Sequence, residues 1–138
     1  MDIDVRGPRF SAALTCVVLS AAFLLRSQAL LAAQVAVFAV AAIAGLRWSP
    51  YGQLFRLIKR RFGLGPPPAT EPEAGPRFSQ TLGGVFAGAG LALILAGVAW
   101  GWALVLAVVA LSALLALTGL CVGCELHAVG TRLRRQRA

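Results

Sequence analysis

Cys121 and Cys124 are the one pair of reactive side chains that this sequence sets at a useful spacing. On a helix, residues three positions apart face the same side, and their α-carbons allow a disulfide if the helix end relaxes. Gly123, between the two cysteines, makes such relaxation easier. Paired thiols at this distance could cycle between dithiol and disulfide, or carry sulfur to a partner. The chemistry that these residues offer is therefore thiol redox or sulfur transfer.

The element that should position this motif is the end of the last apolar run of the chain, residues 102–122. We expect the motif at the C-terminal end of a membrane helix, where the helix dipole and the adjacent Glu125 disfavour a thiolate. Arg9 and Arg77 would favour the thiolate if they converge there. A thioredoxin-type motif has its first cysteine at a helix N-terminus, so the spacing alone does not identify an oxidoreductase.

Other chemistries have less support in the residue pattern. The two motif cysteines with His127 and Glu125 do not make a structural zinc site, because a second Cys or His pair is absent. We therefore predict no metal and no cofactor. No Ser/His/Asp arrangement, phosphate loop or paired intramembrane carboxylates occur either. A packing role for the motif cysteines stays open, as for Cys16, which is typical of a small buried residue in the first helix.

The composition is that of a membrane protein. Of 138 residues, 59% are hydrophobic and 13% are charged, and the mean hydropathy is +0.80. Four apolar runs approach the ~20 residues that cross a bilayer core as a helix. These runs are residues 10–25, 29–46, 80–99 and 102–122. We predict an all-α membrane protein with four transmembrane helices, in a single membrane domain over residues 1–138.

The positive charge of the chain is distributed according to these runs. A net charge of +8 raises the question of nucleic acid. The basic residues, however, precede the first run, separate the second from the third, or follow the fourth: Arg6, Arg9, Arg47, Arg56, Lys59, Arg60, Arg61, Arg77, Arg132, Arg134, Arg135 and Arg137. With four spans, all of them lie on one face, which the positive-inside rule makes cytoplasmic. We predict an inner-membrane protein with cytoplasmic N- and C-termini, contacts with the lipid bilayer and no nucleic-acid partner.

The pentapeptide Gly-Pro-Arg-Phe-Ser occurs twice, at residues 7–11 and 75–79. Each copy stands just before a pair of apolar runs, which indicates two helical hairpins in the same orientation, 10–46 and 79–122. We expect a parallel repeat with an approximate twofold axis along the membrane normal. This symmetry would place the arginines of the two copies beside one site, on the face that carries the motif cysteines. Coincidence in a chain rich in Gly, Pro and Arg is the alternative.

The segment between the hairpins has a different character. Residues 50–62 follow a Ser-Pro helix start and place apolar residues at helical spacing opposite a basic side. We predict an amphipathic helix in the cytoplasmic membrane interface, with docking of a soluble partner as the alternative role. Residues 64–76 form a proline-rich linker with nothing to bury, and residues 123–138 form a basic cytoplasmic tail.

Three segments carry a resemblance to a known family: Asp4–Phe10, Gly75–Phe78 and Gly119–Cys124. In these the chain resembles the domain of unknown function 4395 family, which are uncharacterised bacterial membrane proteins, and the resemblance covers nearly the whole chain. In that family an aromatic residue commonly follows the terminal motif, where this chain has His127. The family's genes often neighbour genes for thioredoxin-like proteins and sulfurtransferases. The resemblance therefore implies a redox or sulfur context and no mechanism.

The functional expectation is a cytoplasm-facing thiol site. Cys121 and Cys124 would exchange electrons or sulfane sulfur with a thioredoxin-like or rhodanese-like partner, while Arg9, Arg77 and His127 would contact an anion or that partner. The sequence favours no independent enzymatic activity. The alternative is a non-catalytic small membrane subunit or a transport component for a small sulfur anion, in which the cysteines only pack.

Overall fold

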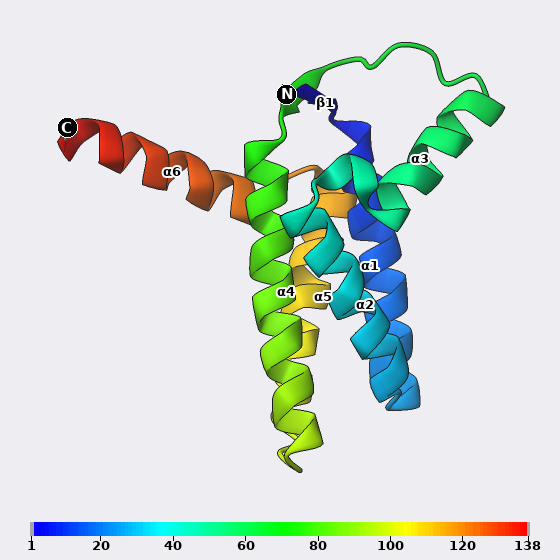
Figure 1. Cartoon of the computed structure of the whole chain (residues 1–138), viewed down its shortest axis with the longest axis vertical. Coiled ribbons are helices and arrows are strands. Elements are labelled where there is room, and N and C mark those ends of the chain that lie inside the picture. The colour runs from blue at the N-terminus through cyan, green and yellow to red at the C-terminus, as the bar shows by residue number, and fades with distance from the viewer. Residues whose placement is uncertain (1, 138) are drawn as a thin grey trace.

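The computed structural model describes residues 2–137, which form six α-helices, a 3₁₀ turn and a two-stranded sheet (Figure 1). In chain order, the elements are β1 Asp2–Asp4, α1 Arg6–Leu25, α2 Gln28–Ile43, the turn η1 Leu46–Trp48, α3 Pro50–Arg61, β2 Thr70–Pro72, α4 Ala74–Leu95, α5 Gly101–Thr118 and α6 Val122–Arg137. The predicted all-α class is confirmed.

Three helices of the described chain are long and apolar enough to cross a membrane: α1, α4 and α5. The fourth expected span, α2, is apolar but has 16 residues. At 1.5 Å per residue it reaches about 24 Å, which is shorter than the ~30 Å hydrocarbon core of a typical bilayer. Length and composition therefore identify three candidate spans, and a spanning role for α2 stays a prediction.

Four helices, α1, α2, α4 and α5, run side by side along the long axis of the molecule (Figure 1). The most extensive contacts join α1 to α5 and α2 to α4, so each hairpin packs chiefly on the other one. The core between them is apolar, and Leu19, Leu31 and Val105 have no exposed surface. Near one end of the bundle, α3 and α6 turn away from the axis in different directions (Figure 1).

Glycines allow the bundle helices to approach closely. A β-carbon on Gly90 of α4 would lie 2.7 Å from the carbonyl oxygen of Gly101 in α5. A β-carbon on Gly83 would lie 3.0 Å from the ring of Phe38 in α2. Any larger residue at these positions would separate the helices, which in lipid associate mainly through close packing.

A small antiparallel ribbon forms where the sequence predicted only a linker. β1 pairs with β2, and Ile3 lies opposite Glu71. Asp4 forms ion pairs with Arg6 at 2.8 Å and with Lys59 of α3 at 3.1 Å. The linker segment is thus ordered by pairing with the N-terminal strand β1, a partner that no local sequence pattern reveals. Both strands stand just before a candidate span, and the two pentapeptides form the first turns of these same helices, α1 and α4.

Candidate functional site

The last candidate span, α5, ends before the cysteine motif and not within it. α5 stops at Thr118, and Gly119 follows in a left-handed conformation with φ 78°. Glycine is the residue that adopts this helix-ending conformation without strain. A new helix, α6, begins at Val122. The expectation that the motif closes a membrane helix at its C-terminal end was therefore wrong, because the motif opens a separate helix.

Cys121 occupies the position just before the first residue of α6. Its carbonyl oxygen accepts the Glu125 N–H at 3.0 Å, and its Sγ accepts the Cys124 N–H at 3.2 Å. The Cys121 sulfur thus takes the place of the oxygen that usually caps a helix. The electrostatics are the reverse of those expected, because the N-terminal end of a helix carries partial positive charge and favours a thiolate.

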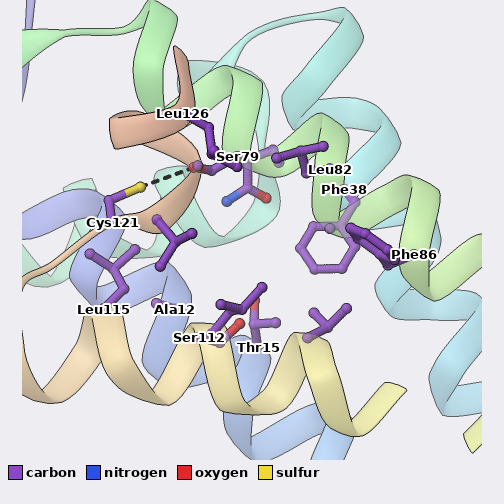
Figure 2. Close-up of a pocket in the computed structure, with 16 residues that line it drawn as sticks. Ala12, Thr15, Phe38, Ser79, Leu82, Phe86, Ser112, Leu115, Cys121 and Leu126 are labelled. Atoms are coloured by element: carbon purple, nitrogen blue, oxygen red, sulfur yellow. Dashed lines mark hydrogen bonds between the residues drawn. The ribbon is translucent and has the colours of Figure 1, made fainter. Parts of the chain in front are cut away.

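A second donor reaches the same sulfur from α4. The Ser79 hydroxyl lies 2.9 Å from Cys121 Sγ and 3.9 Å from Cys124 Sγ (Figure 2). Because Cys121 and Cys124 are joined in a disulfide, with α-carbons 5.1 Å apart, neither sulfur carries a proton and the hydroxyl is the donor. After reduction, the same two donors would stabilise the Cys121 thiolate, since hydrogen bonds to a charged group are the stronger kind.

The other cysteine is packed against α4. A β-carbon on Gly75 would lie 3.4 Å from both the Sγ and the Cβ of Cys124. A β-carbon on Gly123 would lie 2.9 Å from the Ser79 α-carbon, so only glycine permits this close crossing of α6 and α4. The crossing sets the distance between Ser79 and Cys121.

Sequence reasoning did not place Gly75 or Ser79 in the site. A signal was present, because both belong to the second copy of the repeated pentapeptide, residues 75–79. The repeat indicated where each hairpin begins, but it did not reveal a contact with the motif cysteines.

Arg9 lies beside the loop that leads to Cys121. Its Nη2 donates to the carbonyl oxygen of Ala116 at 3.1 Å, and its guanidinium carbon is 3.8 Å from where a Gly119 β-carbon would be. Arg9 therefore caps the C-terminal end of α5, where carbonyl groups lack helical partners and a positive charge is favourable.

Arg77 makes the equivalent contact with the other hairpin. Its Nε donates to Ala42 at 2.8 Å, and its Nη2 donates to Ile43 at 2.6 Å, so that it caps the end of α2. Among the described residues, the hydrogen bonds of this guanidinium go to α2 and not to the motif cysteines. The structure thus brings Arg9, but not Arg77, to the segment that carries the thiols.

His127 lies on α6, one turn after Cys124, and packs on the ring of Phe78 with centroids 5.5 Å apart. The first pentapeptide makes a matching contact, in which Phe10 packs on Phe55 of α3 at 5.6 Å. In each case the pentapeptide phenylalanine packs on the helix that follows its own hairpin, α3 or α6. His127 therefore occupies an aromatic packing position beside the thiols.

A cavity of about 280 Å³ extends from Cys121 into the bundle, between α1, α4, α5 and α6, and Phe38 of α2 also lines it. Figure 2 shows Cys121 and Ser79 on one side of this cavity and Phe38 and Phe86 on the other. Most of the lining is apolar, and Ser112 on α5 is one of its few polar residues. Cys121 therefore borders a mostly apolar cavity within the helix bundle.

A buried polar chain starts at the wall of this cavity. The Thr15 hydroxyl lines the cavity and accepts a hydrogen bond from Gln34 Nε2 at 3.2 Å, and the Tyr51 hydroxyl donates to Gln34 Oε1. Burial raises the pKa of Tyr51, which keeps its hydroxyl protonated as the donor. This chain links the cavity to α3 and satisfies the buried polar groups.

Within residues 2–137, no three or more His, Cys, Asp or Glu side chains gather closely enough to hold a metal ion. The arrangement of the two cysteines is a disulfide at a helix N-terminus, with hydrogen-bond donors on Cys121 and packing on Cys124. No curated protein and no solved structure is significantly similar to this chain. Over residues 3–132 it matches the domain of unknown function DUF4395, and the chain belongs to that family.

Proposed function

We propose that this protein is a membrane-bound thiol–disulfide exchange site that works with a soluble thioredoxin-like or rhodanese-like partner. One observation carries the proposal: Cys121 Sγ caps the N-terminus of α6 and accepts hydrogen bonds from both Cys124 N–H and Ser79. Helix N-termini and nearby donors lower the cost of a thiolate, which is the reactive form of cysteine. A purely packing role would not require two donors on one sulfur.

In this proposal the chain spans the inner membrane four times as two parallel hairpins, and α2 completes the set with local thinning of the bilayer. α3 and α6 then lie in the cytoplasmic interface, because both are rich in arginine and lie near the same end of the bundle (Figure 1). Exposed apolar side chains support this placement of α3. Leu57 in the helix and Phe62 just after it are 61% and 74% exposed beside the basic residues. The thiol pair faces the cytoplasm.

The proposed thiol–disulfide exchange follows from the different surroundings of Cys121 and Cys124. The thiolate of Cys121 attacks a disulfide of the partner, forms a mixed disulfide and releases one partner thiolate. Cys124 then attacks Cys121 Sγ, which forms the intramolecular disulfide and releases the second partner thiolate. Two electrons pass to the partner, and the reverse sequence returns them. With a persulfide partner, Cys121 attacks the outer sulfur and carries it while the partner leaves as a thiol.

Trapping of the mixed disulfide tests this proposal. In a Cys16→Ala background, Cys124→Ala should accumulate a covalent complex with a thioredoxin whose only cysteine, the attacking one, has first been converted to its mixed disulfide with thionitrobenzoate. Cys121 displaces the thionitrobenzoate, and the complex persists because the resolving thiol is gone. The matched Cys121→Ala variant should form much less of this complex, since Cys124 is packed against α4. Non-reducing electrophoresis and mass spectrometry measure both. If neither cysteine forms a mixed disulfide or a persulfide, the proposal is wrong.

A second candidate is a small membrane subunit that takes up a sulfur anion, with the cysteines as packing. The observation in its favour is a cavity of about 430 Å³ between α1 and α3, whose lining includes Arg47, Arg56 and Lys59 together with Asp4 and Glu73. This candidate predicts that replacing both motif cysteines by alanine leaves assembly and anion flux intact. Thiol exchange predicts that the same double variant is inactive.

A further inference from the structure

The cavity beside Cys121 has the properties of a site for a small lipid-soluble ring. We infer that it binds a membrane quinone, which accepts the two electrons of the Cys121–Cys124 dithiol. The inference rests on the proposed thiol exchange and adds the electron acceptor to it. It is carried by the position of the cavity, its lining and its opening.

The cavity lies beside the Cys121 sulfur. Cys121 is part of the cavity wall, whereas Cys124 packs against Gly75 on α4. A molecule in the cavity therefore meets the sulfur that receives the two hydrogen bonds, Cys121 Sγ. The remaining wall comes mainly from helices α1, α4 and α5, all of them candidate membrane spans, together with Phe38 of α2 and the first turn of α6. The cavity thus connects the thiol site with membrane depth.

The lining and the volume fit a single substituted ring. Phe38 and Phe86 offer aromatic faces, and the hydroxyl groups of Thr15 and Ser112 offer donors for carbonyl oxygens (Figure 2). A volume of about 280 Å³ lies just below the ~300 Å³ at which pockets for drug-sized ligands begin. The head group would fill the cavity, and the isoprenoid tail would remain outside it.

The opening faces lipid. Phe86 of α4 and Leu111 of α5 line the cavity and are nevertheless 41% and 44% exposed. Because both residues belong to candidate spans, the surface that they expose meets hydrocarbon when the chain is in a bilayer. A hydrophobic acceptor could therefore enter from the membrane, while a soluble partner reaches the motif from the aqueous side.

The electron transfer balances without another reactant. The Cys121 thiolate adds to a ring carbon of the quinone and forms a carbon–sulfur bond. The Cys124 thiolate then attacks Cys121 Sγ, so that the disulfide forms and the carbon–sulfur electron pair stays on the ring. The ring takes up the two protons that the thiols released and leaves as the quinol. Two thiols are oxidised, and one quinone is reduced by two electrons.

The test uses the full chain in nanodiscs, reduced and freed of reductant, with ubiquinone-1 as the probe. We expect one quinol, followed by absorbance, for each Cys121–Cys124 disulfide, followed by differential alkylation. Ser112→Leu should fill the cavity and slow this oxidation about tenfold or more, the equivalent of 1.4 kcal/mol of lost binding. Ala110→Leu is the matched control, since Ala110 is exposed on the same helix and does not line the cavity.

Binding without chemistry gives a second readout. The Cys121→Ala/Cys124→Ala variant should still bind ubiquinone-1 in equilibrium dialysis, and adding Ser112→Leu should abolish that binding. Equal oxidation rates in Ser112→Leu and Ala110→Leu, or no binding to the double variant, would overturn the quinone site. If the reduced protein exchanges with thioredoxin but not with ubiquinone-1, the quinone site is wrong and thiol exchange stands. If ubiquinone-1 oxidises the motif but thioredoxin forms no mixed disulfide, the soluble partner is wrong.

Discussion

At the scale of single residues, the features of the candidate site meet at the sulfur atom of Cys121. It caps α6, accepts the Ser79 hydroxyl and borders the cavity. Cys124 differs from it in position, because it lies inside the helix and against Gly75. An attacking thiol needs access and a stabilised anion, whereas a resolving thiol needs only proximity. The two cysteines have these two sets of properties.

Removing the α4 donor should weaken the attacking thiol. In the Cys16→Ala/Cys124→Ala background, Ser79→Ala should slow alkylation of Cys121 by iodoacetamide at pH 7 about tenfold, because hydrogen bonds to charged groups contribute about 1.5–3 kcal/mol. Mass spectrometry of the labelled protein gives the rate. Ser11→Ala is the control, since Ser11 holds the same place in the first pentapeptide and lines the other cavity. Equal rates in the two variants would contradict the role of Ser79.

At the scale of elements, the break between α5 and α6 decides what the motif can do. Hydropathy could not locate this break, because Leu120, Cys121 and Val122 continue the apolar run across it. The glycine at 119 was visible, but only its backbone conformation shows that it ends α5. The four apolar runs and the start of α3 were predictable, since each depends on local sequence. The contact of Ser79 with Cys121 joins two helices and was not.

The β1–β2 ribbon supplies a prediction with a pH sign. The Arg6 hydrogen bond, against burial and with Lys59, holds the pKa of Asp4 well below its ordinary value of 3.8. A carboxyl with a lowered folded pKa stabilises the fold above its unfolded pKa and loses this contribution as pH falls through the folded value. Protection of the ribbon amides should therefore be constant from pH 7 to pH 5 and decline below 3.8.

Hydrogen exchange of peptides that cover the two strands, corrected for intrinsic rates, measures this decline. Asp4→Asn is the comparison, because it removes the titrating group and leaves Glu71, whose pKa burial raises. The acid-dependent loss of protection should be smaller in Asp4→Asn than in the parent chain. An identical decline in both would show that the ion pairs of Asp4 do not hold the ribbon.

At the scale of the whole molecule, one end of the bundle carries the ribbon, α3 and α6, and the other carries the α4–α5 turn (Figure 1). The basic residues of α3 and α6 gather at the first end. If the chain spans the membrane four times, as proposed, the positive-inside rule predicts that this end is cytoplasmic. The soluble partner and the membrane acceptor would then meet the motif from different directions.

Site-directed labelling tests this orientation. In a chain without its native cysteines, Ala99→Cys should react with a membrane-impermeant maleimide in intact spheroplasts, while Gln136→Cys and Pro67→Cys should react only after permeabilisation. The reason is that residues 67 and 136 belong to the end with α3 and α6, and residue 99 to the opposite turn. Labelling of residues 99 and 136 from the same side would show that α5, the helix between them, does not cross the membrane.

The packing of α1 on α5 and of α2 on α4 also bears on how the protein is made. While the ribosome is still producing the second hairpin, the first has no partner for its main contact surfaces. The carbonyl groups at the end of α2 lack their hydrogen bonds until Arg77 has been synthesised. Arg9 likewise lacks its carbonyl partner until the end of α5 has been made. The two hairpins therefore complete each other late in synthesis, and a chain truncated before α5 would remain an unassembled substrate for membrane proteases.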